Sequence, residues 1–184
     1  MIVKKKTILK SEEDLLDFGE RIGQRLKAEL QKNPEAIVIE LVGDVGAGKT
    51  TLTRGIAKGL GINAAITSPS FTISKQYAFK LGASRARKDS SLDISKTQEN
   101  SSLDASEAQE SLGTLVHYDF YRLDEPGLMA EDLAEMIQYD NTVVIVEWGD
   151  SIAEVLPEKR TIYNIYINDD ESRLVVENKN ETLS

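Results

Sequence analysis

The sequence predicts one α/β domain, in which helices flank a mixed β-sheet that also contains antiparallel strands. Apolar segments rich in β-branched residues alternate along the chain with amphipathic segments, a pattern typical of a sheet covered by helices. A glycine-rich segment stands directly between one such strand and one such helix. The chain has 184 residues, of which 40% are apolar and 29% are charged, so it is long enough to bury one substantial core. We therefore expect residues 1–184 to form a single domain.

The first part of the chain is predicted to form a strand, a helix and a buried strand. Residues 3–9 read as a short strand with lysines on its outer face. Ser11 resembles a helix N-cap because Asp14 follows three residues later, and apolar residues then recur every three or four positions until the helix ends near Pro34. Residues 36–42, AIVIELV, are almost continuously apolar, as expected of a strand buried on both faces.

A phosphate-binding loop is predicted directly after this strand. Residues 43–50 read GDVGAGKT and satisfy the pattern G-x-x-x-x-G-K-[ST], and residues 49–60 form a predicted helix that ends at Gly61. An ordinary glycine-rich turn is the alternative, but the order of strand, loop and helix favours phosphate binding. Lys49 is expected to reach the β- and γ-phosphates, and the Thr50 hydroxyl to ligate Mg²⁺. The residues predicted to contact the nucleotide here are Asp44, Val45, Gly46, Ala47, Gly48, Lys49, Thr50 and Thr51.

The middle of the chain contains a segment of low complexity between two predicted strands, at residues 72–79 and 115–121. This segment includes a tandem repeat, SSLDISKTQEN followed by SSLDASEAQES, and has very few large apolar residues. So little apolar surface cannot offset the entropy of ordering, so residues 83–113 are predicted to be a disordered insertion at the tip of a hairpin. A weak helix is the alternative.

The remaining elements close the sheet. A helix is expected at residues 131–138, and TVVIV at residues 142–146 is a strongly apolar strand that suits a neighbour of the phosphate-loop strand. A short helical segment is expected around residues 151–156. Residues 161–167 and 173–177 alternate in polarity and predict an antiparallel pair, and the polar residues 178–184 predict a frayed tail.

Two acidic residues at predicted strand ends are candidate partners for a metal ion. Mg²⁺ at a phosphate loop needs a second protein anchor, usually an acid at the end of an apolar strand. Glu147 ends TVVIV and is the preferred anchor, whereas Asp119 could lie in the second shell of the metal or position a water molecule. For each, the simpler interpretation is a solvated acid at a strand end. His117 and Trp148, taken alone, are more typical of structural residues.

Composition excludes several classes of function. The chain has no cysteine, so disulfides and thiolate metal sites are impossible. A net charge of −9 makes the chain a poor direct binder of nucleic acid. No apolar run approaches the roughly 20 residues that span a bilayer, and no segment resembles a signal peptide, so we expect a cytoplasmic location and no membrane partner.

Four motifs, taken together, identify a family. GDVGAGKTTLTRG, SPSFT, HYDFYRL and VEW, in that order, resemble the bacterial TsaE family, P-loop ATPases that support threonylcarbamoylation of adenosine 37 in tRNA. The resemblance extends from Ser11 to about Arg173 and does not include the insertion. Ser70 stands where the family usually has Thr, which preserves the hydroxyl.

The resemblance implies ATP and Mg²⁺ as ligands and assigns roles to matching positions. It implies that Lys49, Asp119 and Glu147 are catalytic residues, that Thr50 and Glu147 hold the metal, and that Glu12 lies near the nucleotide. It also implies two protein partners, the threonylcarbamoyl transferase subunit TsaD and its paralogue TsaB. ATP hydrolysis would reset the complex of these two proteins between turnovers. A partner would then hold the tRNA. A small P-loop kinase acting on a metabolite and a nucleotide-dependent binding module remain as alternatives.

Overall fold

The computed structural model describes residues 2–83, 110–121, 123, 125 and 127–180. The helices are α1 (Glu12–Leu30), α2 (Lys49–Leu60), α3 (Leu128–Met136) and the short 3₁₀ helix η1 (Gly149–Ile152). The strands are β1 (Ile2–Leu9), β2 (Ile37–Val42), β3 (Ser74–Ala83), β4 (Glu110–Asp119), β5 (Thr142–Glu147), β6 (Thr161–Ile167) and β7 (Arg173–Asn180). None of the helices within these ranges is long and apolar enough to cross a membrane.

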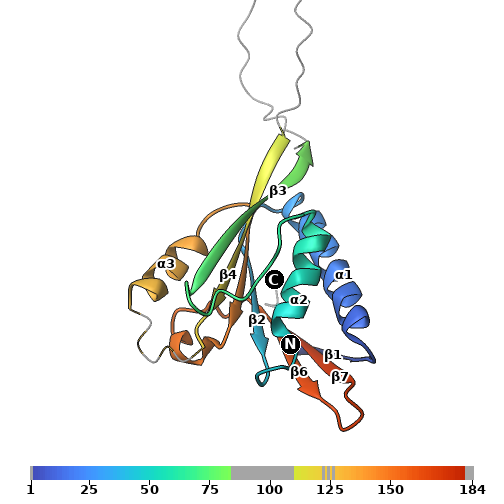
Figure 1. Cartoon of the computed structure of the whole chain (residues 1–184). Helices are drawn as coiled ribbons and strands as arrows, with labels where there is room; N and C mark the ends of the chain where they lie inside the picture. The colour runs from blue at the N-terminus through green and yellow to red at the C-terminus, as the bar shows by residue number, and fades with distance from the viewer. Residues whose placement is uncertain (1, 84–109, 122, 124, 126, 181–184) are drawn as a thin grey trace, which may run out of the picture.

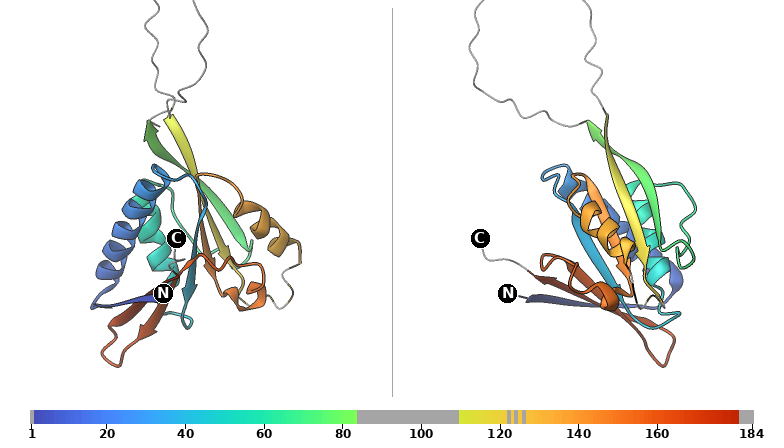
Figure 2. Two further views of the ribbon diagram at one scale, coloured as in Figure 1. Left: turned by 180° about the vertical axis from the view of Figure 1, so that it is seen from behind. Right: turned by 90° about the vertical axis from the view of Figure 1, so that its left-hand side faces the viewer.

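The described strands form one sheet in the order β1-β7-β6-β2-β5-β4-β3. Helices α1 and α2 lie side by side against one face of this sheet, and α3 and η1 lie on the other (Figures 1 and 2). Each face therefore has its own apolar cluster, one beneath α1 and α2 and the other beneath α3 and η1. This arrangement confirms the predicted α/β fold with a mixed sheet.

The centre of the sheet is parallel, and this brings three strand ends to one edge. Strand β2 pairs in parallel with β5 and β6, and β4 pairs in parallel with β5. In this register Leu41 lies beside Glu147, and Glu147 lies beside Asp119. Both predicted acids therefore stand next to the loop that follows β2, as expected where the carboxyl ends of parallel strands meet.

Helix α1 begins where the sequence predicted, because its first turn is capped. The Ser11 hydroxyl accepts a hydrogen bond from the backbone N–H of Asp14 (3.0 Å), and the Asp14 carboxylate accepts one from the backbone N–H of Ser11 (3.1 Å). Such a reciprocal cap satisfies two N–H groups that the helix leaves unpaired and stabilises it by about 1 kcal/mol. The cap also fixes Glu12 as the first residue of the helix.

Glycines allow α1 and α2 to touch backbone to backbone. A Cβ atom at Gly23 of α1 would lie 2.1 Å from the carbonyl oxygen of Ile56, and one at Gly59 of α2 would lie 2.1 Å from the carbonyl oxygen of Glu20. No larger side chain fits at either position without separating the helices. Because α2 starts in the phosphate loop, this contact anchors the loop against α1.

The boundaries predicted for the insertion and for the C-terminal tail were wrong. Strands β3 and β4 continue to Ala83 and Glu110, which pair with each other, so part of the predicted insertion 83–113 belongs to the sheet. Asn178 lies in β7 between β1 and β6, whereas the tail was predicted to fray from this residue. In both places the neighbouring strands supply partners for the backbone N–H and C=O groups. Polar residues have the same backbone groups as apolar residues, so they can pair in a strand equally well. Residues 84–109 and 181–184 lie outside the described part of the chain.

Candidate nucleotide-binding site

A cavity of about 350 Å³ lies at the sheet edge where β2, β4 and β5 end. It brings together residues that are far apart in the sequence, including most of those predicted to bind a nucleotide. The predicted residues that line it are Val45, Gly46, Gly48, Lys49, Thr50, Thr51, Asp119 and Glu147. Ser68, Ser70, Tyr121 and Trp148 complete its wall.

The loop between β2 and α2 has the backbone shape that phosphate binding needs. Gly46 and Gly48 both have positive φ angles, of 83° and 105°, a conformation that other residues adopt with strain. A Cβ atom at Gly48 would also lie 2.5 Å from the side chain of Leu15. Helix α2 then starts at Lys49, so the unpaired N–H groups and the positive end of the helix dipole lie at the cavity.

Lys49 is buried at the base of this loop. Its Nζ donates hydrogen bonds to the carbonyl oxygens of Gly43 (2.6 Å) and Asp44 (3.0 Å). It also lies 4.1 Å from the ring centroid of Trp148, a cation–π contact. Burial lowers the pKa of the Lys49 ammonium, and the carboxylates of Glu147, Asp119 and Asp44 oppose this shift. The ammonium is therefore held within the site by carbonyl oxygens and an aromatic face.

Glu147 is a buried carboxylate with two side-chain donors on the same oxygen. The Thr50 hydroxyl donates to Oε1 at 3.4 Å, and His117 Nε2 lies 2.9 Å from that oxygen. The Glu147 side chain is only 3% exposed, and that of His117 is fully buried. The structure thus places the predicted metal-side acid beside the predicted metal-side hydroxyl. The contact with His117 was not foreseen from the sequence.

Asp119 accepts three hydrogen bonds. The hydroxyls of Ser68 and Ser70 each donate to Oδ2 at 2.6 Å, and the backbone N–H of Tyr121 donates to Oδ1 at 3.0 Å. The SPSF segment, which alone reads as a turn, is therefore held to the site through this carboxylate. Sequence analysis noted that Ser70 keeps the hydroxyl of the family's usual Thr, but it did not connect either serine with Asp119.

The oxygen ligands at this edge suit Mg²⁺. A hydroxyl and a carboxylate, from Thr50 and Glu147, are hard donors of the kind that Mg²⁺ prefers. Within the described ranges, no group of three or more His, Cys, Asp or Glu residues could hold a metal ion. Mg²⁺ at a phosphate loop typically takes one or two protein ligands together with phosphate oxygens and water.

A second cavity of about 650 Å³ adjoins the first and contains Glu12. The two cavities share Gly46, Gly48 and Thr51, and the Thr51 hydroxyl lies 3.5 Å from a carboxylate oxygen of Glu12. Arg173 lines this second cavity, and its Nε donates to the carbonyl oxygen of Ala47 at 3.2 Å. The first residue of β7 therefore supports the phosphate loop, another contact that sequence reasoning missed.

Two residues of the predicted nucleotide set lie apart from both cavities. Ala47 is 1% exposed, and its N–H donates to the carbonyl oxygen of Asp44 at 3.1 Å. Asp44 lines a smaller cavity of about 240 Å³, which Trp148 also lines. In this structure the Ala47 N–H group is therefore used within the loop itself.

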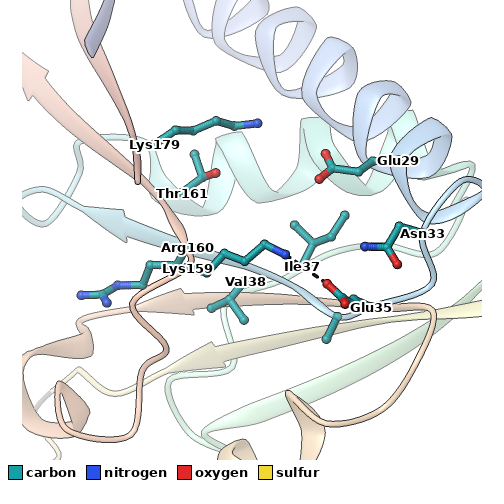
Figure 3. A pocket seen from close by; sticks show the side chains of 10 residues that line it. Glu29, Asn33, Glu35, Ile37, Val38, Lys159, Arg160, Thr161 and Lys179 are labelled. Atoms are coloured by element: carbon teal, nitrogen blue, oxygen red, sulfur yellow. Dashed lines mark hydrogen bonds and ion pairs between the residues drawn. The ribbon is translucent and has the colours of Figure 1, made fainter. Parts of the chain in front are cut away.

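A further cavity, of about 360 Å³, lies at the opposite end of β2 (Figure 3). Figure 3 shows Lys159 pointing toward Glu35, and the two side chains form an exposed ion pair at 3.0 Å. None of the predicted site residues lines this cavity. Its exposed charges are typical of a solvated surface, so we do not assign it to the nucleotide.

Comparisons with known proteins agree with the motifs. The model of the family described as "Threonylcarbamoyl adenosine biosynthesis protein TsaE" matches residues 9–112 and 102–176, two stretches that overlap within the predicted insertion. The tRNA threonylcarbamoyladenosine biosynthesis protein TsaE of Streptomyces coelicolor is 32% identical over 147 residues, covering 78% of this chain and 73% of that protein. The protein of the same name from Haemophilus influenzae is 30% identical over 162 residues, covering 85% and 78%.

A solved structure extends the likeness to the fold. The crystal structure of Bacillus subtilis YdiB matches with a TM-score of 0.60 and 26% sequence identity, and the match covers 97% of this chain and 87% of that chain. The likeness therefore includes the closing strands as well as the phosphate loop.

Proposed function

Because this chain belongs to the TsaE family of threonylcarbamoyl adenosine biosynthesis proteins, we propose that it binds and hydrolyses ATP to support formation of threonylcarbamoyladenosine in tRNA. The observation that carries the proposal is the convergence of Lys49, Thr50, Asp119 and Glu147 on one cavity beside the phosphate loop. Packing of an α/β domain alone does not require a lysine and two acidic residues to line the same cavity beside the phosphate loop. The whole chain, residues 1–184, acts in this proposal as a single ATPase domain.

The two adjoining cavities together suit one nucleotide. We place the phosphates in the cavity that contains Lys49 and the nucleoside in the larger one beside Glu12 and Thr51. Backbone N–H groups at the start of α2 then donate to phosphate oxygens. When ATP binds, Lys49 Nζ would exchange the carbonyl oxygens of Gly43 and Asp44 for phosphate oxygens. The loop therefore holds the Lys49 ammonium in the site before the nucleotide binds.

The metal side of the site follows from the same geometry. Thr50 and Glu147 would hold Mg²⁺, which neutralises charge on the β- and γ-oxygens when bound. Asp119, fixed by Ser68 and Ser70, would either help to hold the metal from outside its direct ligands or orient the attacking water. The two serines keep this carboxylate in one position, which either role requires.

The proposed partners are the transferase subunit TsaD and its paralogue TsaB. The net charge of −9 supports contact with proteins rather than with the tRNA phosphate backbone. Hydrolysis would reset the transferase complex between turnovers. Since such a complex modifies tRNA, we place the protein in the cytoplasm.

Phosphate release measured with and without the transferase pair tests this function. We expect slow release by the chain alone and faster release with the pair. A small kinase would instead require an added acceptor before the γ-phosphate leaves ATP. A binding module would bind ATP and release no phosphate under either condition, and that result would refute the proposal.

A further inference from the structure

We propose that His117 is a positioning residue that fixes the carboxylate of Glu147 in the orientation needed for the metal. This inference rests on the proposed function, since it concerns how the metal side of the same site is held. Its basis is the 2.9 Å contact between His117 Nε2 and Glu147 Oε1, in which both side chains are almost completely buried.

The contact follows from the register of two parallel strands. His117 lies in β4, directly beside Ile145 of β5. Glu147 lies two residues after Ile145, at the end of β5. The imidazole therefore reaches diagonally to the carboxylate at the sheet edge. The Thr50 hydroxyl meets the same oxygen from α2. Both side-chain donors thus act on Oε1, and they prevent the carboxylate from rotating about its last bond.

The other imidazole nitrogen indicates which tautomer is present. His117 Nδ1 is the one buried side-chain nitrogen or oxygen atom of the described residues that lacks a hydrogen-bond partner. A proton on Nδ1 would bury an N–H bond with no acceptor, which is more costly than burying a bare lone pair. The proton therefore belongs on Nε2, where it is donated to Glu147. Through this one hydrogen bond the ring orients the Glu147 carboxylate.

Loss of the Nε2–H donor should weaken the metal site more than it weakens the fold. A carboxylate with one donor removed can turn away from Thr50, so fewer of its orientations suit Mg²⁺. Groups that orient a metal ligand typically change metal affinity by about 10- to 100-fold when removed. Nucleotide binding without Mg²⁺ depends on the phosphate loop and Lys49, so it should not change.

The experiment compares three replacements of His117 in the full chain. His117→Phe keeps the ring shape without any donor. His117→Gln can carry an N–H group to about the place of Nε2, whereas the shorter amide of His117→Asn reaches only the place of Nδ1. Val116→Ala is the matched control, because Val116 is the preceding residue of β4, is fully buried and packs in the apolar cluster of the opposite face. Thermal unfolding of each variant reports on the fold.

The readout is ADP affinity, measured by calorimetry at a series of Mg²⁺ concentrations, so that it does not depend on hydrolysis. We expect His117→Phe and His117→Asn to need at least about tenfold more Mg²⁺ than the wild type to reach the same ADP affinity. For His117→Gln, the Mg²⁺ concentration needed should stay within about threefold of the wild-type value. Val116→Ala should lower the unfolding temperature and leave the Mg²⁺ dependence unchanged. Wild-type dependence in a folded His117→Phe, or equal shifts in the Gln and Asn variants, would overturn the proposal.

This titration, together with a phosphate-release assay of the wild-type chain, separates this inference from the proposed function. A wild-type chain that binds ADP with Mg²⁺ but never hydrolyses ATP would refute the ATPase activity and leave the role of His117 to be decided by the variants. If His117→Phe does not fold, the contrast between Gln and Asn still decides. If the ADP affinity of the wild-type chain does not change with Mg²⁺ concentration, the proposed metal site and the proposed role of His117 are both wrong.

Discussion

Replacing Gly23 with alanine tests how the helix of the phosphate loop is held in place. In an exposed helix this change would stabilise the protein by about 1 kcal/mol, because alanine is the better helix former. Here the added Cβ would lie 2.1 Å from the carbonyl oxygen of Ile56 and 2.9 Å from the Cα of Gly59. Both neighbours are backbone atoms, which cannot rotate away as a side chain could, so α1 and α2 must separate.

Overpacking of this kind costs about 3 kcal/mol at the upper end of the usual range. After the gain in helix propensity, we expect a net loss of about 2 kcal/mol, which for a domain of this size lowers the unfolding temperature by about 4–8 °C. Gln24→Ala is the control, because Gln24 is the next residue of α1 and is exposed. Thermal unfolding followed by circular dichroism is the assay. A Gly23→Ala variant more stable than the wild type would show that the two helices do not touch as described.

Four further predictions concern the site and the insertion. Lys49→Ala should abolish ATP hydrolysis with the fold intact, measured by phosphate release and circular dichroism; wild-type turnover in a folded variant would exclude the phosphate-loop assignment. Glu147→Gln should bind ATP but need more Mg²⁺ for turnover than Asp119→Asn, and the reverse order in a Mg²⁺ titration would show that the two roles are exchanged. ATP binding should change the fluorescence of Trp148, the one tryptophan of the chain, since Lys49 must leave its ring; an unchanged spectrum at saturation would contradict that contact. Replacing residues 84–109 by a two-residue turn should leave basal ATPase activity nearly unchanged, because β3 and β4 are paired up to the cut; loss of folding would show that the segment packs on the domain.

The central elements of the fold could be predicted because their sequences have only one interpretation. Residues 142–146 are apolar on both faces, so they had to be a strand in the middle of a covered sheet, and β5 is buried along its whole length. The capping residues Ser11 and Asp14 fixed the start of α1 through local hydrogen bonds alone. Where local chemistry decides the structure, the prediction was confirmed.

Features that depend on contacts between distant segments could not be predicted in this way. Asn178 is polar and has no strand preference, yet it lies in β7 because β1 and β6 pair with it on both sides. Gly23 and Gly59 look like weak points of two helices until the helices are placed together. These contacts have no local sequence signal, although glycines spaced four residues apart in both helices are a clue in retrospect.

The candidate site shows the same division. The sequence predicted Glu147 and Asp119 as two candidates for the metal side of the site, and the structure places them side by side on neighbouring parallel strands. The hydrogen bonds of Ser68 and Ser70 with Asp119 depend on how the loop after α2 returns across the cavity, which no pattern in the SPSF segment encodes.

The most direct test of the central claim is the yield of threonylcarbamoyladenosine per transferase complex. It is measured over time with purified TsaD, TsaB, tRNA, this chain and a preformed, activated threonylcarbamoyl donor. With the wild-type chain, we predict repeated turnovers that depend on ATP and Mg²⁺. We expect Lys49→Ala to retain the fold without hydrolysing ATP. With this variant, product should stop at about one equivalent per complex, because the step that needs hydrolysis is lost. Equal yields from the wild type and a folded Lys49→Ala variant would contradict the account, since the modification would then not require ATP hydrolysis at this site.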